Sequence, residues 1–222
     1  MIRRFPYEAA FLARTKLRYV NLSSILSDGK VDRSARVPAF VAIYLGTETG
    51  LIFLQQGEPV AAAVVRAAER RPVSVADVIQ RGELDSERAE AGYYRVAAGQ
   101  LNAMWASVAA PPLVEAEPAR LASTASLLEW LRECAPAAAV EVLADDAVAY
   151  LLTAEGEVME AWLPGRTAQG GTPDLEGLLT RPAGAAVSAR AFTPMETIPP
   201  QATPALFALY ERTAAAALEV SA

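Results

Sequence analysis

The 222-residue sequence predicts an α/β (α+β) protein built from two similar units. Three observations lead to this prediction. The stretch GLIFLQQGEPVAAAVV, which starts at residue 50, has a counterpart in AYLLTAEGEVMEAWLPG, which starts at residue 149. Both copies pass from an apolar run through a polar tip that contains Gly-Glu into a second apolar run, as paired strands do, and both are flanked by apolar residues at helical spacing. With 53% hydrophobic residues, the chain can form one large core or two smaller domains.

The repeat aligns without a gap from Val41 against Val140 until each copy reaches Gly-Glu. In the first copy, alternating residues at 41–45 predict a strand, residues 46–50 predict a flexible tip, and residues 51–54 predict a second strand. A third strand follows the Gly-Glu turn, at residues 60–65 in the first copy and 158–163 in the second. Each copy therefore predicts a three-stranded antiparallel meander.

Helical spacing continues after each meander, at residues 75–81 and 175–181. A short strand and another helix are expected next, the helices at residues 100–108 and 204–220. NLSSILSDG and SLLEWLREC predict a helix before each meander. The predicted units are thus helix, three-stranded antiparallel meander, helix, strand, helix. They occupy residues 1–112 and 121–222, joined by a proline-rich linker at 113–120.

The charge pattern limits the choice of partners. The net charge is −6, and residues 113–222 are strongly acidic, so nucleic acid is not expected as the main ligand. Basic residues near the N-terminus, including Arg4, Arg14 and Lys16, are expected on a solvated first helix rather than at a nucleic-acid or lipid contact.

The composition also argues against most catalytic chemistry. The sequence has no histidine, which excludes a Ser-His-Asp arrangement and a histidine-ligated zinc site. Cys134 is the only cysteine, which excludes an intramolecular disulfide and a cysteine-rich zinc site. We therefore predict that the protein is not an enzyme and has no catalytic residues, metal or cofactor.

Localisation is predicted from what the sequence lacks. The longest apolar stretches are far shorter than the roughly 18 to 20 residues that a membrane-spanning helix needs. The N-terminal residues do not have the apolar segment of a signal peptide. We expect a cytoplasmic protein without membrane contacts, and the bias towards alanine and arginine is typical of a GC-rich bacterial genome.

Two stretches are candidates for binding. In the loop GRTAQGGTPDLEG, Arg166, Gly170 and Gly171 together with the start of the following helix have the elements of an anion site, although a flexible connector has the same composition. In the predicted C-terminal helix, apolar side chains could cover their own sheet or contact another chain; these are Leu206, Phe207 and Tyr210. The two units could accordingly form a monomer with pseudo-twofold symmetry or a homodimer.

With a leucine-rich helix before it and another helix after it, GLIFLQQGEPVAAA resembles the PATAN-type domains of prokaryotic regulatory proteins. The resemblance covers part of each half and implies a scaffolding or signalling role without catalytic residues. This chain lacks the receiver-like or effector segment that often accompanies such domains. A second resemblance, of SLLEWLRECAPAAAVEVLADDAVAYLLTAEGEVMEAW, is to roadblock-type regulators of small GTPases, but LPGRTAQGGTPD stands where their long helix is expected.

The sequence therefore predicts a non-enzymatic adaptor or regulatory scaffold that acts through protein–protein contacts of a duplicated unit. The alternative is a small-molecule or anion-binding module, including a histidine-free enzyme that uses carboxylates.

Overall fold

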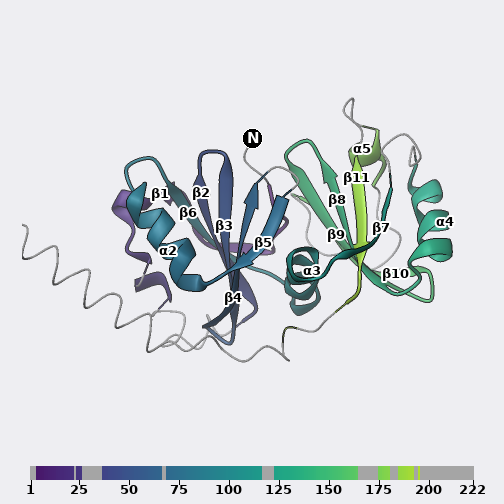
Figure 1. The fold of residues 1–222 in the computed structure, drawn as a ribbon, viewed down its shortest axis with the longest axis horizontal. Helices are drawn as coiled ribbons and strands as arrows, with labels where there is room; N and C mark the ends of the chain where they lie inside the picture. The colour runs from purple at the N-terminus through teal and green to yellow at the C-terminus, as the bar shows by residue number, and fades with distance from the viewer. Residues whose placement is uncertain are drawn as a thin grey trace, which may run out of the picture.

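Two antiparallel β-sheets form most of the protein in the computed structural model (Figure 1). The structure describes residues 4–22, 24–26, 37–66, 69–116, 123–164, 175–180, 185–192 and 195. Within these residues, strands take up more of the chain than helices. The predicted α/β (α+β) class is therefore wrong, and the fold is mostly β.

The first sheet has six strands in the order β1-β6-β2-β3-β4-β5, and every neighbouring pair is antiparallel. The strands are β1 (Ala9–Lys16), β2 (Ala39–Leu45), β3 (Glu48–Gln55), β4 (Glu58–Arg66), β5 (Glu69–Val73) and β6 (Glu90–Arg95). Two of the N-terminal basic residues, Arg14 and Lys16, belong to β1 and not to a helix. Pairing with β6, far away in the sequence, holds this segment extended.

The second sheet has five antiparallel strands in the order β10-β9-β8-β11-β7. They are β7 (Pro112–Ala116), β8 (Ala138–Ala144), β9 (Ala147–Ala154), β10 (Glu157–Trp162) and β11 (Ala186–Arg190). β7 occupies part of the stretch predicted to be a linker. Read from one edge, β7-β11-β8-β9-β10 follows the same order as β1-β6-β2-β3-β4.

Matching turns close the second hairpin of each meander. Gln56 and Gly57 connect β3 to β4, Glu155 and Gly156 connect β9 to β10, and all four residues have positive φ. Two such residues in succession are typical of a type I′ turn, whose twist suits a two-residue hairpin. The predicted tip at residues 46–50 is shorter than expected, because β3 already begins at Glu48.

Four α-helices and a 3₁₀ turn, η1 (Leu17–Tyr19), lie among the described residues. The helices are α2 (Val75–Leu84), α3 (Ala98–Ala109), α4 (Thr124–Cys134) and α5 (Glu176–Leu179). Ser74 caps α2 through a reciprocal pair of hydrogen bonds with Asp77, and Ser123 caps α4 in the same way with Ser126. α5 has only four residues, fewer than the helix predicted at 175–181.

Helices cover the sheets in layers. α2 packs on one face of the first sheet, and α4 and α5 pack on one face of the second. α3 follows the first sheet in the chain but contacts β8 and β9 of the second sheet as well as β5 of the first, and Figure 1 shows it between the two sheets. One apolar cluster contains side chains of both sheets and of α3, including Phe40, Phe53, Met104, Tyr150 and Trp162. The two sheets therefore share a core.

No helix in the described part of the chain combines the length and the apolar character that crossing a bilayer requires.

We predict that Gly50→Ala destabilises the protein. Gly50 lies in β3 under α2, and a Cβ atom there would come within 2.6 Å of the Val78 side chain. Because α2 must shift to relieve the overlap, we expect the free energy of unfolding to fall by about 1–3 kcal/mol, measured by urea denaturation. The control is Gly177→Ala, where an added Cβ meets nothing within 4 Å. An equal loss in both variants would contradict this account of β3 and α2.

Candidate functional site

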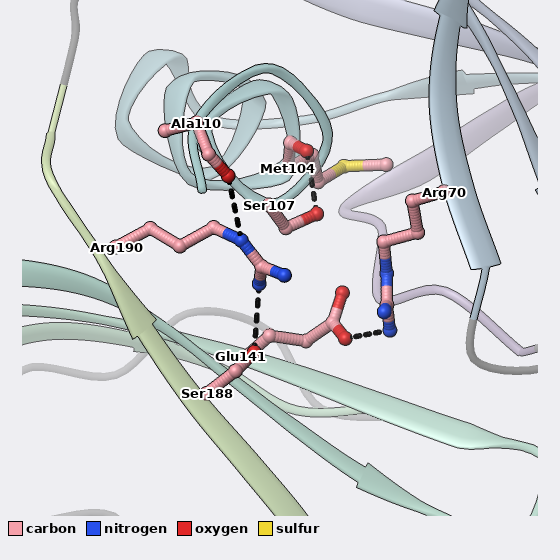
Figure 2. Close-up of polar contacts among 7 residues, drawn as sticks. All are labelled: Arg70, Met104, Ser107, Ala110, Glu141, Ser188 and Arg190. Atoms are coloured by element: carbon pink, nitrogen blue, oxygen red, sulfur yellow. Dashed lines mark hydrogen bonds and ion pairs between the residues drawn. The ribbon is translucent and has the colours of Figure 1, made fainter. Parts of the chain in front are cut away.

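Three charged side chains are buried where the two sheets meet (Figure 2). They are Arg70 from β5, Glu141 from β8 and Arg190 from β11, and we call them the charged junction. The side chains of Arg70 and Glu141 are 10% and 3% exposed. Charged side chains are almost never buried to this extent without a partner, so this cluster marks a position that depends on both sheets.

The strand pattern of β8 explains why Glu141 points towards the first sheet. Val140 and Val142 belong to the apolar cluster under α4 and α5. Since successive side chains of a strand point to opposite faces, Glu141 lies on the other face with Ala139, which belongs to the core shared by the two sheets. A carboxylate on that face needs a cation from another element, and β5 supplies it.

An ion pair joins the two sheets at the charged junction. Arg70 Nη2 donates to Glu141 Oε1 (Figure 2). The other carboxylate oxygen, Oε2 of Glu141, is buried and has no hydrogen-bond partner among the described residues. The pair therefore links strands from separate sheets. The Oε2 atom of Glu141 is stabilised only by the charges around it.

Arg190 adds the second cation and connects α3 to the junction. Its Nε donates to the Ala110 carbonyl oxygen at 3.0 Å, and its Nη1 donates to Ser188 Oγ at 2.7 Å (Figure 2). Burial lowers the pKa of Arg190, and the nearby Glu141 carboxylate opposes this effect. Ala110 is the C-terminal cap of α3, so Arg190 holds this helix end on the second sheet.

The N-terminal strap, residues 4–8, joins the sheets at a second place. Arg4 N donates to the Asp146 carbonyl oxygen at 2.6 Å, and its side chain pairs with the Asp146 carboxylate, with 2.7 Å between Nε and Oδ2. Glu8 N donates to the Arg95 carbonyl oxygen in the first sheet at 2.9 Å. Between them, Gln100 of α3 donates to the Pro6 carbonyl oxygen at 2.5 Å. The strap thus contacts the second sheet, α3 and the first sheet in turn.

The charged junction and the strap can hold the sheets in one orientation. A buried ion pair adds little net stability, because its desolvation offsets the attraction, but it disfavours arrangements that separate the two charges. In the residues that the structure describes, no group of three or more His, Cys, Asp or Glu side chains could hold a metal ion.

The site residues predicted from the sequence do not belong to the junction. Arg166, Gly170 and Gly171 lie outside the described residues, as do Leu206, Phe207 and Tyr210. These predictions stay untested. Sequence reasoning missed Glu141, although a carboxylate inside the apolar run VEVLA was a signal that could have identified it.

No protein-family model, no curated protein and no solved structure matches this chain. The resemblances to PATAN-type and roadblock-type domains and the division at residues 113–120 therefore remain predictions.

We predict that Arg70→Ala destabilises the protein because it leaves the Glu141 carboxylate buried without its cation. The expected loss is about 3–5 kcal/mol in the free energy of unfolding, measured by urea denaturation. Replacing both partners, Arg70→Met with Glu141→Leu, should restore part of this stability, because the buried carboxylate is then gone while Arg190 keeps its hydrogen bonds to Ala110 and Ser188.

The control for Arg70→Ala is Arg132→Ala, which removes an exposed ion pair with Glu157. Exposed pairs contribute about 0–1 kcal/mol, so this variant should unfold almost as the unmodified protein does. If Arg70→Ala and Arg132→Ala have the same stability, the charged junction does not hold the sheets together.

Proposed function

We propose that the protein is a cytoplasmic, non-enzymatic adaptor or regulatory scaffold that binds another protein. The observation that supports this function best is the open edge of the second sheet at β7. Within the described residues, β7 pairs with β11 on one side and with no strand on the other. An edge strand of this kind offers backbone N–H and C=O groups to a strand of a partner protein.

Side chains beside this edge favour a protein partner. Leu113 in β7 is 55% exposed, and Phe192, two residues after β11, is 41% exposed. Strand addition takes its affinity from backbone hydrogen bonds and its specificity from side chains next to the edge. An exposed leucine and an exposed phenylalanine provide apolar contacts of that kind.

The equivalent edge of the first sheet is less suited to strand addition. β1 occupies the position that β7 has in the second sheet, and Phe11 is exposed on it. However, the pairing of β1 with β6 is irregular at two places, and β1 carries Arg14 and Lys16. Irregular, charged edges are a common protection against unwanted pairing, so we assign the docking edge to β7.

The shared core supports a scaffold rather than two independent binding modules. α3, the charged junction and the N-terminal strap all contact both sheets. A partner bound at β7 is therefore held in a defined position relative to every surface of the first sheet. Such a composite surface is what an adaptor needs in order to bring two partners together.

We predict that Leu113→Ser weakens binding of the partner protein. The partner is isolated from native-host lysate with the full-length chain as bait, purified, and bound again to the purified chain in a calorimeter. Loss of the leucine contact at the edge should reduce the affinity about tenfold, which corresponds to about 1.4 kcal/mol. The control is Leu84→Ser, because Leu84 is 82% exposed but lies at the end of α2, away from a sheet edge.

Two outcomes would show that this proposal is wrong. One is that no purified protein forms a complex with the unmodified chain. The other is that Leu113→Ser and Leu84→Ser change the affinity equally, which would place the contact away from β7.

A further inference from the structure

A cavity of about 350 Å³ lies between the N-terminal strap and the first sheet. The strap contributes Arg4 and Tyr7 to its wall, β1 contributes Arg14, and β2 and β6 contribute Tyr44 and Tyr94. A volume of this size is within the range of small-molecule sites, about 300–1,000 Å³. No residue of β7 lines the cavity, whereas Pro164, two residues after β10, does.

Aromatic rings line one side of the cavity. The Tyr94 ring lies 4.7 Å from the Tyr7 ring and 5.1 Å from the Phe40 ring, between centroids, and both pairs are tilted by 34°. Tyr7 is 47% exposed, whereas Phe40 is fully buried. The Tyr94 phenol folds back over Gly92, where a Cβ atom would collide with its hydroxyl group. Tyr94 is itself buried against these two rings, so the Tyr7 ring is the aromatic surface that a planar ligand can contact.

Two tyrosine hydroxyl groups give this wall a polar end. A hydrogen bond between the Tyr44 and Tyr94 hydroxyl groups raises the pKa of Tyr44 and lowers that of Tyr94. Burial is the largest effect on both groups and raises both pKa values, so both phenols are neutral at physiological pH. Two neutral hydroxyl groups joined by one hydrogen bond leave one O–H donor of the pair for a ligand.

Arg14 supplies the charge at this end of the cavity. Its guanidinium carbon lies 4.4 Å from the centre of the Tyr44 ring, and its Nε donates to Glu90. The two terminal nitrogens of Arg14 have no hydrogen-bond partner among the described residues. A guanidinium held by stacking and by a carboxylate on Nε is pre-positioned to bind an anion with its terminal nitrogens.

The distribution of charge around the cavity favours an anion. Arg4 and Arg14 line the cavity. Their carboxylate partners, Asp146 and Glu90, are not among the described residues that line it. The cavity therefore presents guanidinium and phenol donors to a ligand, and the Glu90 carboxylate, which is paired with Arg14, lies close enough to Tyr94 to raise its pKa. An apolar ring fits the aromatic side, and an acidic group fits the donors.

We propose that this cavity binds a small planar organic anion, an aromatic ring that carries one acidic group. The ring packs against Tyr7, and the acidic group accepts hydrogen bonds from Arg14 and from the Tyr44–Tyr94 hydroxyl pair. The strap forms part of the cavity wall and also contacts both sheets. Bound ligand therefore stabilises the relative orientation of the two sheets that the strap helps to hold.

The test is isothermal titration of the full chain with defined probes. The anionic ring probes are adenosine monophosphate and indole-3-carboxylate, their neutral counterparts are adenosine and indole, and inorganic phosphate is the anion without a ring. We expect at least one anionic ring probe to bind at least about tenfold more tightly than its neutral counterpart and than phosphate. Arg14→Gln should then weaken this binding about tenfold, and Tyr94→Phe, which keeps the ring, should weaken it by a smaller factor.

Arg132→Gln is the matched control, because it removes an arginine from an exposed ion pair that is not part of the cavity. It should leave binding unchanged, and thermal unfolding of each variant verifies that it is folded. The proposal is overturned if no anionic ring probe binds at millimolar concentration, or if the neutral counterparts bind equally well. It is also overturned if a folded Arg14→Gln variant binds as the unmodified chain does.

Discussion

The packing of α3 against the second sheet is the interaction on which the rest of the structure depends. α3 follows the last strand of the first sheet in the chain, yet it contacts β8 and β9 and places Met104 in the core that both sheets share. Without this contact, the faces that carry Phe53 and Tyr150 would be exposed to water. Burying large aromatic side chains is among the strongest contributions to folding, so the two sheets gain stability by remaining together.

The polar contacts between the sheets fix the orientation in which their apolar faces pack. Apolar burial has no preferred orientation, whereas an ion pair such as Arg70 with Glu141 is satisfied in few arrangements. Arg190 holds the end of α3, and Arg4 links the strap to the hairpin between β8 and β9. The same strap forms one wall of the aromatic cavity, so the position of the sheets and the shape of the proposed ligand site depend on common residues.

The hairpins and the helix α2 could be predicted from residues close together in the sequence. Alternating residues identified the two meanders, and apolar spacing together with Ser74 and Asp77 accounts for α2. The fold class was wrong because sheet size depends on pairing between distant segments. β1 and β7 are extended because β6 and β11 lie beside them, and α5 is a single short turn despite its helical spacing.

By itself, the sequence determined the strand period of the two meanders, the Gly-Glu hairpins and the absence of histidine chemistry, since these depend on neighbouring residues or on composition alone. Only the tertiary structure decided which faces meet. In the sequence, Glu141 is only a polar residue in an apolar strand, and the structure shows that it pairs with Arg70 of β5. Tyr94 would be taken for a core tyrosine, and the structure shows that it lines a cavity with Arg14 and the strap. Burial and charge pairing depend on contacts between distant residues. The packing of the sheets therefore established the charged junction and the aromatic cavity.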